Sequence, residues 1–191
     1  MENLNSLEHH FLIAMPNLAD SWFEKTLVYV VEDNQHGSMG LVVNLPHKLI
    51  LSQLLEHFQL PTDRLNSRSD LAEQVIMMGG PVDMEHGFIL HQPPGDWQKS
   101  IHLKDNLAMT VSEDFLKAVS EGNQPEKLLV CLGFAGWEAG QLNEEIQQNN
   151  WLPIPYNESL LFDIEPDQKW LVALNTLGIS PESLSMEAGH D

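Results

Sequence analysis

The chain has 191 residues, of which 28 are Asp or Glu and nine are Lys or Arg, giving a formal net charge of −19. The nine cations are scattered, so the chain lacks the basic stripe that displaces counterions from a nucleic acid, and we expect no direct nucleic-acid binding. Hydrophobic residues make up 42% of the chain, which argues against a disordered protein, and no apolar run reaches the length of a membrane span.

The start of the chain and its cysteine content predict the compartment. Residues 1–8 lack the basic start and the apolar run of a signal peptide. Cys131 is the single cysteine, so an internal disulfide is excluded, as is usual in a reducing compartment. We therefore expect a cytoplasmic protein without a membrane segment. The length favours one domain, which we place at residues 1–180, followed by a flexible tail at residues 181–191.

The first quarter of the chain predicts three strands. His10–Met15 is a short apolar segment that ends at Pro16. Thr26–Val31 is apolar on both faces and rich in β-branched residues, which is typical of a central strand. A polar loop ending at Gly37 leads to a second apolar run, Met39–Leu45, so the two runs predict a β-hairpin.

The next stretch predicts a helix and then a loop. Leu51, Leu54, Leu55 and Phe58 follow the spacing of an amphipathic helix with one apolar face. Gln59–Asp70 is rich in loop-forming residues, and we expect it to be irregular.

The middle of the chain predicts a second hairpin followed by a capped helix. Val75–Met78 and Gly87–His91 are two apolar runs joined through Gly79-Gly80-Pro81, which favours a hairpin corner. Leu107–Val111 predicts another strand, and Ser112 is placed to cap the helix that follows it.

The last third holds the stretch around which we expect the chain to be organised. Leu128–Leu132 is an uncharged apolar run, typical of a strand buried on both faces. Gly133–Gly140 predicts a turn into a helix that begins near Leu142. Trp151–Tyr156 contains two prolines and suits an edge strand. A final helix is predicted by a shared apolar face of Trp170, Leu171, Leu174 and Leu177. Together these segments predict an α+β fold: a mixed, largely antiparallel sheet flanked by helices.

The two glycine-rich corners are the candidate ligand-binding sites. Exposed backbone amides at such corners can bind a ligand, whereas the simpler interpretation is a tight turn where two backbones approach each other. The residues on which a site would depend are Gly79, Gly80, Gly133, Gly136 and Glu138, with His91 nearby as an acid or base. This hypothesis requires both corners to lie together in space and to line one pocket.

Other catalytic motifs are excluded by their spacing. The Gly133 corner has neither the G-x-G-x-x-G spacing of a dinucleotide site nor the lysine of a P-loop. Ser38 misses the G-x-S-x-G elbow and precedes a strand. The nine histidines show no compact metal-ligand spacing, so we expect neither a metal nor another cofactor. Cys131 lies in mid-strand, where a buried apolar role is simpler than a reactive thiolate.

Several of these segments together resemble the AlgH/YqgE family of bacterial proteins, which has no assigned biochemical function. The matching segments span most of the chain in the family's order: His10–Pro16, Gly40–Asn44, Gly79–Val82, Gly87–His91 and Gly133–Leu142. The resemblance implies a single α+β domain in the cytosol and supplies no catalytic residues. Some members are labelled transcriptional regulators, which here implies indirect regulation because the charge opposes DNA contact. His86 stands where the family pattern has an Arg.

Two functions of different classes remain open. The first, which we favour, is a non-catalytic regulatory or protein-interaction module whose acidic surface attracts a basic protein partner. The second is a small-molecule or nucleotide binder, or an enzyme, that uses the two glycine corners. A redox role for Cys131 comes behind both, and the sequence leaves the oligomeric state open.

Overall fold

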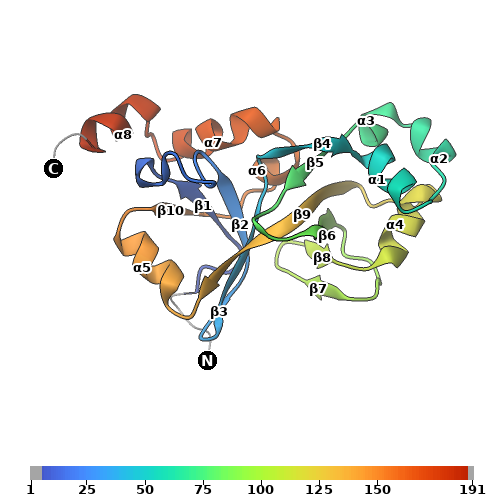
Figure 1. Ribbon diagram of the computed structural model, residues 1–191, viewed down its shortest axis with the longest axis horizontal. Coiled ribbons are helices and arrows are strands. Elements are labelled where there is room, and N and C mark those ends of the chain that lie inside the picture. Colours follow the sequence, from blue (N-terminus) through green and yellow to red (C-terminus); the bar gives the residue numbers. More distant parts are fainter. Residues whose placement is uncertain (1–5, 189–191) are drawn as a thin grey trace.

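The computed structural model describes residues 6–188 and has the α+β fold that the sequence predicts. Figure 1 shows an elongated molecule with a sheet at its centre and helices around it. The strands are β1 His10–Ala14, β2 Leu27–Asn34, β3 Gly37–Val42, β4 Pro46–Ile50, β5 Val75–Met78, β6 Val82–Gln92, β7 Ser100–His102, β8 Ala108–Thr110, β9 Lys127–Glu138 and β10 Trp151–Pro155. The helices are a 3-10 turn at Pro16–Leu18, α1 Leu51–His57, α2 Asp63–Asn66, α3 Ser69–Ala72, α4 Glu113–Ser120, α5 Gln141–Gln147, α6 Glu158–Phe162, α7 Pro166–Asn175 and α8 Pro181–Ala188.

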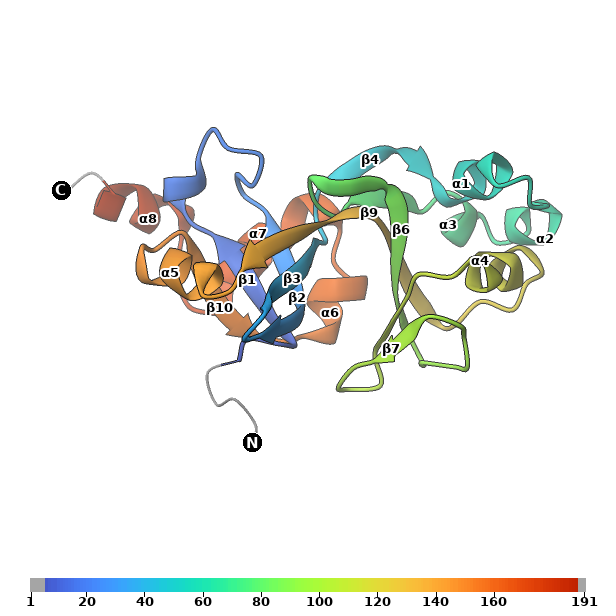
Figure 2. The ribbon, with the colours of Figure 1, turned by 60° about the horizontal axis from the view of Figure 1, so that its bottom comes forward.

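Strand β9 runs through both halves of the molecule and joins them (Figure 2). Its first half pairs with β6 in antiparallel fashion and with β5 in parallel, so that Met77 lies opposite Cys131. Its second half pairs with β3, from Gly40 opposite Ala135 to Gly37 opposite Glu138. The strands of the sheet are therefore ordered β10-β1-β2-β3-β9-β6-β8-β7. Strands β4 and β5 lie outside this order: they pair with each other, and β5 also pairs with β9.

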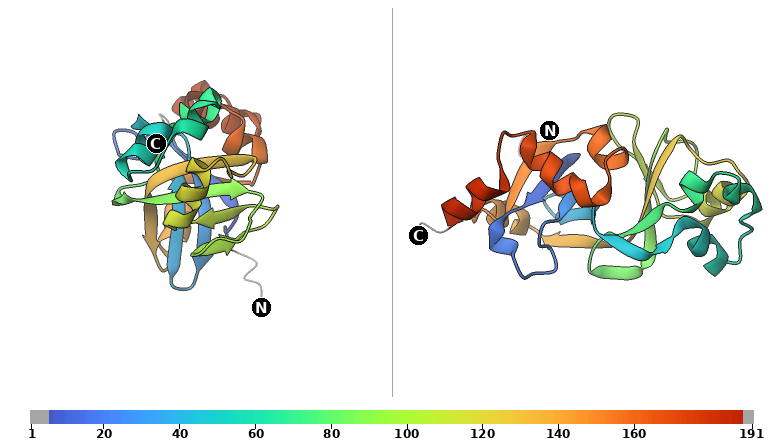
Figure 3. Two further views of the ribbon diagram at one scale, coloured as in Figure 1. Left: turned by 90° about the vertical axis from the view of Figure 1, so that its right-hand side faces the viewer. Right: turned by 90° about the horizontal axis from the view of Figure 1, so that it is seen from above.

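Alternating side chains explain why the first strands are apolar on both faces. Phe11, Leu27 and Tyr29 point into a core that α6 and α7 cover. Leu12 and Val28 point to the opposite face, where α5 and the segment after β1 close a second core. A third core lies in the other half of the molecule, where α1, α2, α3 and α4 pack on β6 and β9. The view along the long axis in Figure 3 shows these helices over the strands at that end.

Gly133 changes the direction in which β9 presents its side chains. Leu129 and Cys131 lie in the core under α6 and α7, but after Gly133 it is Phe134 that packs against this core. Ala135 then belongs to the core that α5 covers. Gly133 has a φ of 79°, a left-handed conformation that shifts the strand's alternation by one residue. The glycine therefore lets one strand serve three cores.

The structure confirms most of the predicted elements in the first third of the chain. The first strand, the central strand and the hairpin between β2 and β3 lie where we expect them. Leu51, Leu54 and Leu55 are buried on α1, whereas Phe58 lies just beyond the helix and is 42% exposed. Strand β10 lies at the sheet edge, as its prolines predict.

Several local predictions were wrong. Residues 75–78 and 87–91 do not form a hairpin, because β9 lies between β5 and β6 and pairs with both. Residues 133–138 are not a turn but the second half of β9, so the corner before α5 is confined to Ala139 and Gly140. The expected loop at residues 59–70 contains α2 and the start of α3. Ser112 stands before α4, yet its hydroxyl donates to the carbonyl of Gln98 at 2.6 Å instead of accepting from the helix.

The last described residues of the chain are helical. Residues 181–188 form α8, and residues 189–191 lie outside the described range, so the flexible tail at residues 181–191 stays a prediction. Among the helices of residues 6–188, none combines the length and the apolar character needed to cross a membrane.

Candidate functional site

The structure brings Gly79, Gly80 and Gly133 together, because the connection from β5 to β6 crosses over β9. A Cβ atom added to Gly79 would lie 2.3 Å from the carbonyl oxygen of Gly133, and one added to Gly133 would lie 2.4 Å from that of Gly80. At Gly80 an added Cβ would lie 1.9 Å from the backbone of Phe134. The amide of Gly79 donates to the Leu132 carbonyl at 2.7 Å. We call this contact the glycine crossing; its backbones fill the space between the two corners.

The other residues of the predicted site lie apart from the glycine crossing. Gly136 lies opposite Met39, and Glu138 lies opposite Gly37 near the end of β9. The amide of Glu138 donates to the side-chain oxygen of Gln141 at 2.9 Å. Five surface cavities in the described part of the chain have linings that include none of the predicted site residues. The role of these residues in ligand binding therefore stays a prediction.

His91 is enclosed in the sheet and has two hydrogen-bond partners. Its ring nitrogens lie 2.7 Å from the Thr110 hydroxyl and 3.1 Å from the Pro93 carbonyl oxygen. The side chain is fully buried, and this burial lowers the pKa of His91 below its usual value. The ring packs against Phe115 with 4.6 Å between ring centroids. His91 is therefore neutral at pH 7 and shielded from a solvent-borne substrate.

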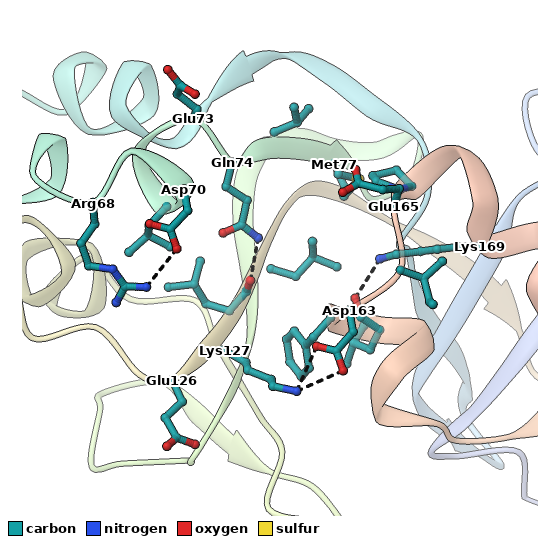
Figure 4. Close-up of a pocket in the computed structure, with 18 residues that line it drawn as sticks. Arg68, Asp70, Glu73, Gln74, Met77, Glu126, Lys127, Asp163, Glu165 and Lys169 are labelled. Atoms are coloured by element: carbon teal, nitrogen blue, oxygen red, sulfur yellow. Dashed lines mark hydrogen bonds and ion pairs between the residues drawn. The ribbon is translucent and has the colours of Figure 1, made fainter.

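A cavity lies between the two halves of the molecule, next to the start of β9 (Figure 4). Its volume is about 550 Å³. One wall comes from α3 and β5, including Glu73 and Gln74, and the facing wall comes from the connection between α6 and α7, including Asp163 and Glu165. We call this the lysine cavity, because Lys169 also lines it.

Lys169 is an almost completely buried cation, with 2% of its surface exposed. Its Nζ donates to the carbonyl oxygens of Leu161 at 2.8 Å and Val43 at 3.0 Å. Burial lowers the pKa of Lys169 to about 8, although the nearby Cys131 and Glu165 oppose this shift. Leu161 lies in the last turn of α6, so the lysine satisfies a carbonyl that this helix leaves without an intrahelical partner.

The rim of the lysine cavity carries charges of both signs, and each of its two rim cations is paired with a carboxylate. Lys127 donates to Asp163 at 3.0 and 3.2 Å, and Arg68 donates to Asp70 at 3.1 Å (Figure 4). Among the residues of the described chain that could hold a metal ion, no group of three or more His, Cys, Asp or Glu comes together. The lysine cavity is thus a polar recess whose cations already have oxygen partners.

Cys131 lies beneath this region and is fully buried. Burial raises the pKa of the thiol to about 12. Its Sγ lies 3.8 Å from the carbonyl oxygen of Val42, within the core that α6 and α7 cover. A thiol in this state is a poor nucleophile at neutral pH, because the reactive form is the thiolate.

Lys169 was missed because the predicted apolar face of α7 was only half right: Trp170 and Leu174 do pack in the core, but Leu171 and Leu177 do not. Lys169, Ala173 and Leu174 are buried, whereas Leu171 and Leu177 are 36% and 43% exposed. The spacing of Lys169 and Ala173, four residues apart on a helix, was the signal that could have indicated it.

A polar cluster near the amino terminus was also missed. His9 lies 2.7 Å from the hydroxyl of Tyr29 through Nδ1 and 2.7 Å from Asp105 through Nε2. Its ring stacks on Tyr156 with 4.2 Å between centroids. Burial raises the pKa of Tyr29 far above its usual value, so this hydroxyl stays protonated. The cluster fastens residues that lie 20 and 96 positions apart in the chain, and its partners could not be found by spacing alone.

Comparison with known proteins places the chain in a family. The AlgH-like sequence family matches residues 11–182. The chain belongs to the AlgH-like family. A UPF0301 protein of Hydrogenovibrio crunogenus is 70% identical over 191 residues, which cover all of both chains. A UPF0301 protein of Chromobacterium violaceum is 47% identical over 190 residues, again with full coverage of both.

Solved structures of similar proteins support the AlgH-like fold. The solution structure of the AlgH protein from Pseudomonas aeruginosa has a TM-score of 0.79 and 41% identity, and covers 100% of this chain and 99% of the other. A crystal structure of a Corynebacterium diphtheriae protein has a TM-score of 0.71, covering 97% of this chain and 93% of that one. At 17% identity this second likeness concerns the fold alone. The family membership predicted from the sequence is confirmed, and the family has no assigned biochemical function.

Proposed function

We propose that this AlgH-like protein is a non-catalytic protein-interaction module that binds a basic protein partner in the cytoplasm. Regulation by such a module acts through the partner and needs no contact with DNA. The observation that carries the proposal is the excess of 28 carboxylates over nine Lys and Arg. A field of this size accelerates the encounter with a positively charged partner and repels nucleic acid.

The environments of the candidate reactive groups also favour binding over catalysis. His91 is fully buried with its pKa lowered by burial, and Cys131 is fully buried with its pKa raised by burial to about 12. A general acid or base must be within hydrogen-bond reach of its substrate, and a nucleophilic thiol must ionise. Neither residue meets its requirement.

The test is affinity purification of the tagged full chain at about 0.05 M and about 0.5 M salt, where the screening length differs several-fold. We expect a specific partner with a basic face at the lower salt concentration and its loss at the higher one. Binding is then measured with the purified partner. A mobility-shift assay with double-stranded DNA serves as the control and should show no complex. Failure to recover any salt-sensitive partner would contradict the proposal.

A second function is favoured by the lysine cavity: the binding of a small polar molecule. Its volume of about 550 Å³ lies in the range of ligand sites, and Lys169 supplies a buried amine whose pKa is lowered to about 8. A thermal-shift screen against nucleotides and common metabolites tests this function. At 100 times its dissociation constant a ligand adds about 2.7 kcal/mol, which raises Tm by several degrees. A hit that Lys169→Met abolishes would place the ligand in this cavity.

A further inference from the structure

A groove lies between α1 and α4, in the half of the molecule away from β10. Its floor consists of the sheet residues Ile89, Val130 and Leu132, and its walls include Leu54 of α1 and Leu116 of α4. The volume is about 1010 Å³, which makes it larger than the lysine cavity. The end-on view in Figure 3 shows α1 and α4 at this end of the molecule, next to the strands. We call this the apolar groove.

Large apolar side chains remain exposed at the edges of the apolar groove. Phe58, directly after α1, is 42% exposed, and Val111, directly before α4, is 39% exposed. Phe58 also reaches a smaller neighbouring recess formed with Leu60 and Leu116. Exposed aromatic and apolar groups at the edge of a depression are typical of a protein-docking surface.

Apart from two histidines, His57 and His86, the titratable residues that line the apolar groove are all acidic. Glu56, Glu85 and Glu113 line it, and its lining contains no Lys or Arg. Within the described part of the chain, these three carboxylates take part in no ion pair with a cation. The rim therefore attracts positive charge, while Phe58, Val111 and the half-buried Leu132 offer the apolar contact surface.

The third edge of the apolar groove comes from an irregular part of β6. Val82 lies opposite Phe134 and Gly87 lies opposite Leu132, so four residues of β6 face a single residue of β9. These four residues, 83–86, are exposed and bring Glu85 to the groove. Such bulges re-aim side chains at functional surfaces.

We propose that the apolar groove binds an amphipathic helix of a protein partner, with Leu-like side chains against Phe58 and Val111 and Lys or Arg against the rim carboxylates. This inference rests on the proposed function and names the surface on which the partner binds. Helix-in-groove recognition uses anchors on one face of a helix, and a helix is about 10 Å wide with its side chains. A second copy of this chain is a poor occupant, because it would bring a further net charge of −19 to an acidic rim.

The experiment measures fluorescence anisotropy of a labelled fourteen-residue peptide of Leu and Lys, arranged so that the Leu residues share one helical face. A peptide of the same composition in scrambled order has the same charge and no apolar face. The full chain should bind the amphipathic peptide about tenfold more tightly than the scrambled one, because only the amphipathic peptide adds apolar contacts to the charge attraction that both share.

Matched charge variants test the location. The groove variant is the triple change Glu56→Gln, Glu85→Gln and Glu113→Gln. The control variant is Glu8→Gln, Glu24→Gln and Glu144→Gln, which removes the same charge from exposed positions in the other half of the molecule. We expect the groove variant to weaken peptide binding about tenfold and the control variant to weaken it less than about threefold, because screening limits distant charges.

The outcomes separate the two proposals. Equal weakening by both triple variants would overturn the groove as the site and leave the basic-partner function intact. Equal binding of both peptides would overturn the amphipathic occupant. Absence of binding to either peptide, together with failure of the salt-sensitive purification, would overturn the proposed function as well. A dimer in sedimentation that Phe58→Asp converts to monomers would identify a second copy as the occupant and overturn the proposal.

Discussion

The lysine cavity and the apolar groove lie on opposite faces of β9 and treat charge in opposite ways. Leu129 lines the cavity, whereas its neighbour Val130 lines the groove. In the cavity, Lys127, Arg68 and Lys169 all have oxygen partners within the protein. At the groove, three carboxylates face solvent with no cation among the lining residues. The cavity also carries carboxylates outside these ion pairs, Glu73, Glu126 and Glu165, but among the two linings only that of the groove presents carboxylates without Lys or Arg beside them.

The largest expected effect comes from breaking the glycine crossing. Gly80→Ala forces a Cβ into the backbone of Phe134, and this backbone cannot move without displacing β9. We expect a loss of at least about 3 kcal/mol in the free energy of unfolding, measured by urea titration with Trp fluorescence.

Gly136→Ala is the matched control for this change. Its added Cβ would meet nothing closer than the Phe134 ring at 3.5 Å, so its effect should stay below about 1 kcal/mol. Similar losses for the two variants would show that the crossing is not a tight contact.

The second effect concerns Lys169 and depends on pH. The unfolded lysine keeps its proton up to a pKa of 10.5, whereas burial lowers the folded pKa to about 8. The unfolded state therefore binds more protons above pH 8, and stability rises with pH in this window. Relative to Lys169→Met, the wild-type protein should gain about 1 kcal/mol of unfolding free energy per pH unit between pH 8 and 9.

The pH dependence of stability is compared between the two proteins because the titration of Cys131 changes stability in the opposite direction. Its thiol ionises near pH 9 when unfolded and near pH 12 when folded, so it makes stability fall with rising pH above 9. Below pH 9 this contribution is small in both proteins, although Lys169→Met also removes a charge that lowers the Cys131 pKa. Stability curves of the two proteins that run parallel from pH 7 to 9 would contradict a lysine that titrates abnormally.

The third effect sharpens the groove side of the comparison. Phe58→Ala removes an exposed ring from the groove edge, so it should weaken binding of the amphipathic peptide about fivefold while Tm stays nearly constant. Anisotropy gives the affinity and calorimetry gives Tm. Leu171→Ala, at another exposed apolar position in the other half of the molecule, is the control and should change neither. A fall in Tm with unchanged affinity would make Phe58 a structural residue only.

The smallest effect is expected at the rim of the lysine cavity. Lys127→Gln breaks the contacts with Asp163 and Glu158, but these side chains are solvent-exposed and the pair is screened by water and salt. Its Tm should match that of the wild-type protein within the scatter of replicate melts. A clear decrease that disappears at high salt would show that charge pairing in the cavity stabilises the fold after all.

Local apolar patterns were enough to predict the elements whose burial is simple. Thr26–Val31 and Leu128–Leu132 read as strands because each side chain meets a core on its own face. The supposed hairpin at Gly79 failed because its partner strand comes from some 50 residues further along, and no local signal encodes such a pairing. Gly133 was assigned to a turn because a glycine in the sequence looks the same whether its left-handed φ lies at a corner or, as here, inside a strand.

The sites were harder to predict than the fold. Glycine clusters in the sequence do indicate a close approach of backbones, but they do not say whether a ligand or another strand fills the space. The groove combines Phe58, Glu85 and Val111, which are separated by more than 20 residues from one another and meet only because α1 and α4 pack on β9 and β6. The charge count predicted an acidic protein that attracts basic partners, but it did not show where on the surface such a partner binds.

The shared strand has a consequence for how the molecule unfolds. Residues 127–132 complete the sheet of one half, and residues 135–138 complete that of the other. Neither half can lose β9 without exposing the core of its neighbour, so the two should melt in a single cooperative transition. Amide protons along this strand should be among the last to exchange with deuterated solvent, on the timescale of global opening.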